Sequence, residues 1–244
     1  YLGIPADRMV VRITSKDSDL IAHWRNAGLK EHLEYDTQPP VYYTHKFGMD
    51  EITGRNCNLA IRDHRTGEPR DIGNIIAIER PDRTIGAEVA FGIETIVSRL
   101  LGFPNPIAAS LMADIVPVKN QHSLKLADAI SSSVVILNAG ERPVATNRGR
   151  VLRKYMQAIG DLRHKGDVTT GDIRKYAEQF EKMEFGSCTE LPAKIEEYIE
   201  KYENLKAQGL KPEKVNAEVS DIFPAQEQGQ RLQRKSLSSR YEPR

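Results

Sequence analysis

The sequence predicts an α+β fold, in which an antiparallel β-sheet with one helix is followed by an all-helical domain. Two observations lead to this prediction. Up to about residue 90, short segments rich in β-branched residues are separated by Gly, Pro and Asn. From about residue 92 to 207, apolar residues recur at helical spacing. We therefore place one domain at residues 1–103 and a second at residues 104–210.

The chain opens with a predicted strand and helix. Residues 9–14 (MVVRIT) are rich in β-branched side chains, which is typical of a strand. Ser15 or Asp17 can cap the helix that follows, and Gly28 ends it. The Pro-rich segment 38–40 then interrupts regular structure.

The next part of the chain predicts a hairpin and a strand that leads into a helix. Strands at 58–62 and 72–79 flank HRTGEPRD, whose Gly and Pro suit a tight connection. A third strand, 83–90, runs directly into a helix at Gly92. These strands complete the expected antiparallel sheet.

Four helices follow. Gly140 closes the first, Asn147 can cap the second, Thr169 or Thr170 begins the third, and Pro192 suits the first turn of the fourth. Residues at helical spacing are Leu126, Ala127, Ile130, Val134 and Leu137 in the first, Val151, Leu152, Tyr155, Met156 and Ile159 in the second, and Ile195, Tyr198, Ile199, Tyr202 and Leu205 in the fourth. Residues 211–244 lose this period and are rich in Gln, Ser and Arg, so we expect a disordered or partner-dependent tail.

Composition restricts the function. The 244 residues can form one or two domains with a sizeable core, and the net charge of +1 means that nucleic-acid binding requires local basic patches. No apolar run approaches the ~20 residues of a membrane span, and the N-terminus lacks a secretory signal. We expect a soluble cytoplasmic protein, or an organellar one after processing, without a membrane partner. The start at Tyr1 indicates a fragment or a processed product.

Metal and disulfide sites are not expected. Cys57 and Cys188 are far apart, and neither they nor the six His residues show a metal-ligand spacing. Two reduced thiols and no zinc are therefore predicted.

Two segments carry a family resemblance: IGAEVAFGIETIVSRLLG at 85–102 and KLADAISSSVVILNAGERPVATNRGRVLRKYMQAIG at 125–160. They resemble alanyl-tRNA synthetase, a class II aminoacyl-tRNA synthetase, and looser similarity extends over about residues 1–165. The resemblance implies the C-terminal half of the antiparallel-sheet catalytic core, joined to the helical tRNA-recognition domain. It also implies ATP and Mg²⁺, and a complementing N-terminal chain that supplies motifs 1 and 2.

The family motif D-T-G-M-G-L-E-R corresponds here to EVAFGIET. The resemblance implies that Glu88 holds the substrate amino group and that Gly92 lets the backbone approach adenine. Glu94 matches the glutamate of the family motif. Thr95 stands where the family has a phosphate-binding arginine, a loss that costs on the order of 10²-fold in rate. Arg99, one turn further on, could reach the same side of the helix.

Two asparagines belong to the upstream family segments. The resemblance implies that Asn74, in DIGNIIA, contacts substrate from its strand. Asn58, in TGRNCNL, replaces a glutamate that would help to hold ATP-bound Mg²⁺, and an amide binds this cation more weakly. The alternative interpretation is that both are polar residues on an exposed sheet face.

PVATNRGRVLRK is the best family match, to P-S-N-E-x-R-G-Y-V-L-R-R. The resemblance implies that the loop and the start of the helix contact the tRNA acceptor stem. A basic cluster on the helix face opposite the apolar stripe suits contacts with phosphate groups. Ala145 replaces the asparagine that reads the G·U pair of tRNA-Ala, so this discrimination should be missing. A solvated basic helix face is the alternative. The candidate tRNA-binding residues are Asn147, Arg148, Arg150, Arg153 and Lys154.

Three functions remain open at this point. The chain is part of an alanyl-tRNA synthetase that activates alanine with ATP and attaches it to tRNA, or a non-catalytic paralogue that binds RNA or serves as an adaptor, or an adenylate-forming relative with another amino acid or acceptor. Thr95, Asn58 and Ala145 favour the second, because each removes a different function. We expect the chain alone to be inactive, with no DNA partner and no residue that is certainly catalytic.

Overall fold

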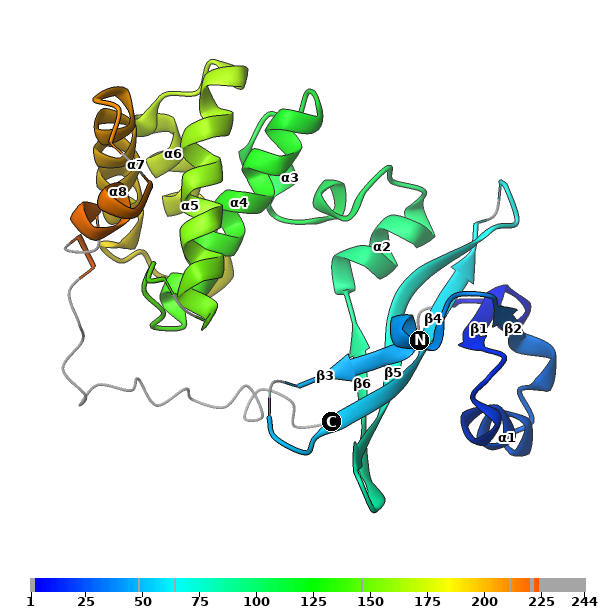
Figure 1. Cartoon of the computed structure of the whole chain (residues 1–244). Helices are drawn as coiled ribbons and strands as arrows, with labels where there is room; N and C mark the ends of the chain where they lie inside the picture. The colour runs from blue at the N-terminus through cyan, green and yellow to red at the C-terminus, as the bar shows by residue number, and fades with distance from the viewer. Residues whose placement is uncertain are drawn as a thin grey trace. The chain divides into compact units, whose positions relative to one another are not determined.

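The computed structural model describes residues 3–47, 49–63, 65–145, 147–210, 212–219 and 222–223. It divides into two compact units, Tyr1–Ala113 and Asp114–Arg244 (Figure 1). Strands and helices both occur in the first unit, and the described part of the second is helical, which confirms the α+β class. The division falls after Ala113 rather than after residue 103, because the 3₁₀ turn Pro106–Ala109 packs against helix α2 (Ile93–Leu101).

The first unit contains a mixed sheet in the order β2-β1-β4-β5-β6, with β3 paired to β4. The prediction of a purely antiparallel sheet is wrong at one pair, because β2 runs parallel to β1. Helix α1 (Ser18–Asn26) lies in the crossover between them, and a parallel pair requires such a connection. The strands are β1 (Met9–Thr14), β2 (Leu33–Asp36), β3 (Thr44–Lys46), β4 (Thr53–Arg62), β5 (Pro69–Arg80) and β6 (Arg83–Phe91).

Several predicted elements are confirmed in the first unit. Strand β1 has the predicted bounds, and Asp17 caps α1 by accepting a hydrogen bond from the Leu20 N–H. Gly28 follows the helix with a φ of 78°, a value that glycine adopts without strain. The hairpin β4–β5 is longer than predicted, since β4 begins at Thr53. In Figure 1, β6 leads directly into α2, as the sequence indicates.

The core of the first unit lies between the sheet and its two helices. Ile21 of α1 is buried against strand residues, and side chains of α2 pack onto the same cluster. The buried members are Val11, Ile13, Ile21, Cys57, Leu59, Ile61 and Ile72. Alternate residues of the strands therefore face the helices, and the others face the opposite side.

The four predicted helices of the second unit are confirmed as α4 (Gln121–Asn138), α5 (Asn147–Arg163), α6 (Thr170–Phe185) and α7 (Leu191–Ala207), after a short α3 (Met112–Ile115) at the division. Thr169 caps α6, and Pro192 lies in the first turn of α7. The buried stripe includes Leu126, Ile130, Leu152, Met156, Ile159, Ile195, Tyr198 and Ile199. Short 3₁₀ turns occur at Ala6–Arg8, Lys30–His32, Pro40–Tyr43, Pro106–Ala109 and His164–Gly166.

Part of the predicted tail is helical. Helix α8 (Pro212–Val219) buries Val215 and Val219 against α7, and Ile222 and Phe223 are buried as well. This segment has too few apolar residues to show a helical period in sequence, and tertiary packing is what makes it a helix. The rest of the predicted disordered tail, 224–244, lies outside the described residues. Within the described ranges, no helix is long and apolar enough to cross a membrane.

Candidate functional site

A hollow of about 410 Å³ lies where β4, β5 and β6 meet the start of α2. Three strands and one helix contribute to it because the antiparallel register places the end of β6, and so the start of α2, beside the middle of β4 and β5. We call it the polar hollow, and its lining consists of Asn58, Asp71, Ile72, Gly73, Asn74, Ala90, Phe91, Gly92 and Thr95.

The register brings the two predicted asparagines side by side. Asn58 of β4 is directly opposite Asn74 of β5, and Asn74 is opposite Ala90 of β6. Paired residues of neighbouring strands project from the same face of a sheet. Asn58 is 9% exposed and Asn74 is half-buried, so these amides are not on a fully solvated surface.

A charged chain of contacts fixes Asp71 at the edge of the polar hollow. Arg12 bonds to the Asp71 carboxylate at 3.0 Å and to the Asp36 carboxylate at 3.1 Å. The Asn58 amide donates to Asp71 at 3.1 Å, and the Tyr43 hydroxyl donates to Asp36 at 2.8 Å. Burial acts to lower the pKa of Arg12, but the two carboxylates outweigh it and raise that pKa. Arg12 therefore remains charged and holds Asp71 in place.

Arg12, Asp36 and Asp71 were not among the sequence candidates. The available signal was Arg12, a single cation at the centre of the apolar strand MVVRIT. A buried-strand arginine requires a carboxylate partner, but the sequence does not identify which of the 34 acidic residues supplies it. Only the register of β1, β4 and β5 decides that.

Two glycines let the backbone approach closely at this site. A Cβ on Gly73 would lie 2.2 Å from the Ala90 carbonyl oxygen, and one on Gly92 would lie 2.7 Å from the Thr95 hydroxyl. Gly92 caps α2, so the positive end of the helix dipole is at the hollow. The helix start and Asp71 give the hollow one electropositive and one electronegative side.

The predicted motif residues divide into two groups. Asn74 and Gly92 line the polar hollow, together with Thr95. Glu88 is exposed on β6 and pairs with Ile76, two positions from Ala90, so it projects from the same face without lining the hollow. Glu94 is exposed on α2 and does not line it either.

Arg99 lies one turn after Thr95 on α2 and is half-buried. Its Nε atom is buried without a hydrogen-bond partner among the described residues. Burial lowers the pKa of Arg99, nearby Arg70 lowers it further, and Asp71 and Asp63 act in the opposite direction. Arg99 is thus an incompletely paired cation within electrostatic range of Asp71.

The residues do not fit a protein-made Mg²⁺ site. Such sites use one or two available carboxylates, whereas Asp71, the only carboxylate lining the described hollow, is already bonded to Arg12 and Asn58. The described residues contain no group of three or more His, Cys, Asp or Glu side chains suited to a metal ion. We derive no chemical step through magnesium.

In the second unit, the predicted basic cluster is on α5. Arg148, Arg150 and Lys154 are exposed, and Arg148 makes a long ion pair of 3.7 Å with Glu141. Arg153 lies apart from them: it is half-buried, its Nε is shielded from solvent, and its charge acts on Tyr198 of α7.

The start of α5 is closely packed on the preceding loop. Asn147 is its first residue, and the side chain of Asn147 lies outside what the structure describes. A Cβ on Gly149 would lie 2.3 Å from the Arg142 carbonyl oxygen. The glycine of the RG pair therefore has a packing role in the described fold.

The chain matches no protein-family model, and a search of curated proteins finds no match either. The relation to alanyl-tRNA synthetase thus stays a prediction based on motifs.

Proposed function

We propose that the chain is part of an alanyl-tRNA synthetase-like protein, in which the polar hollow binds the amino acid and nucleotide and α5 binds the tRNA acceptor stem. The observation that carries this proposal is the convergence of Asn74, Gly92 and Thr95 on one hollow. These three residues come from two separate family motifs. A volume of about 410 Å³ is within the range of small-molecule sites.

The two sides of the hollow match the two charges of an amino acid. Each Asp71 oxygen already accepts one hydrogen bond, from Arg12 or Asn58, and has a second lone pair that can accept from the ammonium group. The asparagine amides supply neutral hydrogen bonds beside it. The start of α2 favours the carboxylate or a phosphate. Arg99 adds a cation one turn along the same helix. This arrangement supports binding of an aminoacyl-adenylate better than binding of a neutral apolar molecule.

In the proposed reaction, a carboxylate oxygen of alanine forms a bond to the α-phosphorus of ATP, and the bond between that phosphorus and the bridging oxygen to the β-phosphate breaks. Pyrophosphate leaves with the bonding electron pair. The polar hollow holds the reactants in line, while Asp71 keeps the ammonium group away from the phosphates. Thr95 offers no charge to the leaving group, so slow chemistry is expected.

Binding of a non-hydrolysable alanyl-adenylate analogue by calorimetry tests this proposal. Asn74→Ala is expected to weaken binding about 10-fold through loss of a hydrogen bond to bound ligand. Asn26→Ala, at an exposed position near the end of α1, serves as the control and should bind as the parent does. Absence of binding to the parent chain would overturn the proposal. Preference for the adenylate of another amino acid would redirect it to a relative with different specificity.

A second candidate, a non-catalytic RNA-binding paralogue, is favoured by the uncharged Thr95 and by three exposed cations on α5: Arg148, Arg150 and Lys154. Binding to tRNA-Ala at two salt concentrations tests it. The double variant Arg150→Glu with Lys154→Glu should reduce the log–log salt slope by about 1–2, because each phosphate contact contributes ~0.7–0.9. Lys182→Glu on the exposed face of α6 is the control.

Analogue binding and RNA binding together separate the candidates. Salt-sensitive tRNA binding without analogue binding or pyrophosphate exchange supports the paralogue. Alanine-dependent exchange supports the enzyme. A chain that binds neither analogue nor tRNA contradicts both.

A further inference from the structure

A second hollow of about 380 Å³ lies on the other face of the same sheet, between α1 and strands β4, β5 and β6. Its strand residues alternate with those of the polar hollow: Cys57 precedes Asn58 on β4, and Ile75 follows Asn74 on β5. Because successive side chains point to opposite faces, the two hollows are separate sites. This one, the apolar hollow, has no counterpart in the proposed function.

Apolar side chains form most of the wall of the apolar hollow. Helix α1 presents one aromatic and one aliphatic residue, and the sheet presents small and branched residues. Ala77 and Ala87 are directly opposite each other on β5 and β6, so two small side chains leave space on the floor. The apolar lining is Leu20, Trp24, Cys57, Ile75, Ala77 and Ala87.

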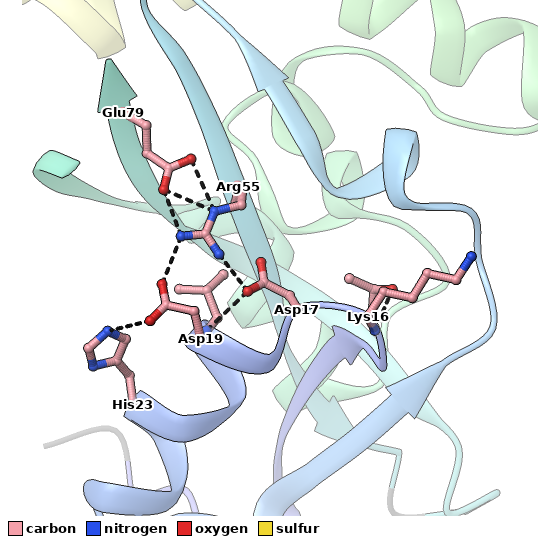
Figure 2. A network of polar contacts seen from close by, with 8 residues as sticks. Lys16, Asp17, Asp19, His23, Arg55 and Glu79 are labelled. Atoms are coloured by element: carbon pink, nitrogen blue, oxygen red, sulfur yellow. Dashed lines mark hydrogen bonds and ion pairs between the residues drawn. The ribbon is translucent and has the colours of Figure 1, made fainter. Parts of the chain in front are cut away.

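The rim of the apolar hollow carries an excess of negative charge. Arg55 bonds to Glu79 at 2.9 Å, to Asp19 at 2.9 Å and to Asp17 at 2.5 Å. Figure 2 shows the Arg55 guanidinium surrounded by these carboxylates, two from the start of α1 and one from β5. Three carboxylates around one guanidinium leave a formal charge of −2 at the rim.

Neighbouring basic groups do not neutralise that charge. Lys16 extends away from the network in Figure 2. Arg80 and Arg83 pair at the end of the β5–β6 hairpin, one position beyond Glu79, and so project from the other face. His23 lies 3.4 Å from Asp19 and is largely exposed, with the pair at the solvent edge of the hollow.

We propose that the apolar hollow binds a small organic cation, namely an ammonium group carried on a compact aromatic or branched aliphatic body. The apolar body fills the space above Ala77 and Ala87, where it removes apolar surface from water. The ammonium group lies at the rim near Asp19, and Trp24 adds attraction through its ring face. An anionic ligand of the same shape would meet the net negative rim and be rejected.

The chain contains a single tryptophan, Trp24, and it lines this hollow. Its fluorescence therefore reports binding directly on the unmodified protein. Three probes with the same apolar body and different head groups are titrated: phenethylammonium, 2-phenylethanol and phenylacetate. We expect phenethylammonium to bind about fivefold more tightly than the alcohol, with the carboxylate weakest.

Two variants distinguish the apolar and charged parts of the site. Ala87→Leu fills the floor and should weaken both the ammonium and the alcohol about 10-fold. Its control is Glu88→Leu, the exposed residue that follows Ala87 on β6, which projects from the other face of the sheet and does not line the apolar hollow. Asp19→Asn should remove most of the ammonium preference and leave binding of the alcohol unchanged. Asp7→Asn, at an exposed 3₁₀ turn before β1, is its control.

The outcomes decide the proposal. The proposal is supported if Asp19→Asn removes most of the preference for the ammonium and Ala87→Leu weakens binding of both the ammonium and the alcohol. Equal binding of ammonium and alcohol, or the absence of a fluorescence response to all three probes, overturns it. Circular dichroism of each variant confirms folding, and an unfolded Ala87→Leu is replaced by Ala87→Val. Because analogue binding occurs on the opposite face, failure here leaves the proposed function unaffected.

Discussion

Glu181 provides the sharpest test of what holds the helical unit together. This carboxylate on α6 is 0% exposed and accepts three hydrogen bonds from Thr189 and Asn138. The Thr189 N–H donates at 2.9 Å, the Thr189 hydroxyl at 2.7 Å and the Asn138 amide at 3.0 Å. It thus joins the end of the α6–α7 connection to the end of α4. The perturbation is Glu181→Gln, which keeps the shape and removes the charge.

The expected loss follows from these contacts. Hydrogen bonds to a charged group contribute about 1.5–3 kcal/mol, and neutral ones about 0.5–1.5 kcal/mol. A glutamine oxygen can still accept two of the three at neutral strength, but its NH₂ then faces the Thr189 N–H, so two donors meet. We expect the free energy of unfolding to fall by about 3 kcal/mol at pH 7.

The effect depends on pH with a definite sign. Burial acts to raise the pKa of Glu181, but the hydrogen bonds from Thr189 and Asn138 outweigh it and lower the pKa. The stabilisation is therefore complete above the unfolded pKa of ~4.3 and is lost as pH falls through the lower folded value. The difference between the parent and Glu181→Gln should shrink below about pH 4.

Urea unfolding followed by circular dichroism at 222 nm, at pH 7, 5 and 3.5, measures this difference. Glu184→Gln, an exposed position on the same helix, is the control and should change stability by less than about 0.5 kcal/mol. A Glu181→Gln protein as stable as the parent at pH 7 would refute the reasoning. A large loss that is the same at pH 3.5 and pH 7 would show that packing, and not charge, is responsible.

Three further predictions concern single residues. Asp17→Ala removes both the α1 cap and an ion pair, so the free energy of unfolding should fall by about 1–3 kcal/mol, measured by urea unfolding followed by tryptophan fluorescence. Asp17→Asn keeps a capping oxygen and should lower the free energy of unfolding by less. Gly149→Ala should lower stability by about 1–3 kcal/mol, measured through the thermal midpoint, because the added Cβ would lie 2.3 Å from a carbonyl oxygen. Its control is Gly171→Ala in the first turn of α6, which has contacts no closer than 3.8 Å and should be neutral or stabilising. A similar loss of stability in both variants would contradict this. Iodoacetamide should label the exposed Cys188 in the folded protein and Cys57 only after unfolding, because the Cys57 thiol is buried out of reach of the reagent. Mass spectrometry showing rapid double labelling would contradict this.

The candidate site was predictable in part. Asn74, Gly92 and Thr95 belong to short motifs with fixed local structure, a strand and a strand-to-helix junction, and they do line one hollow. Asp71 and Arg12 are 59 positions apart, and no local pattern joins them. Arg153 illustrates the converse: spacing on α5 assigned it to the exposed basic face, whereas packing against α7 shields its Nε.

By itself, the sequence determined the local elements, because caps, glycines and apolar periods act within a few residues. It determined the bounds of β1, the hairpin β4–β5, the β6–α2 junction and the helices α4 to α7. Only the tertiary structure decided that β2 pairs in parallel with β1, that Val215 and Val219 make α8 part of the core, and that two separate hollows lie on opposite faces of one sheet. Each of these depends on contacts between residues distant in the chain, and the free energy of such contacts is set by register and packing that no local segment contains.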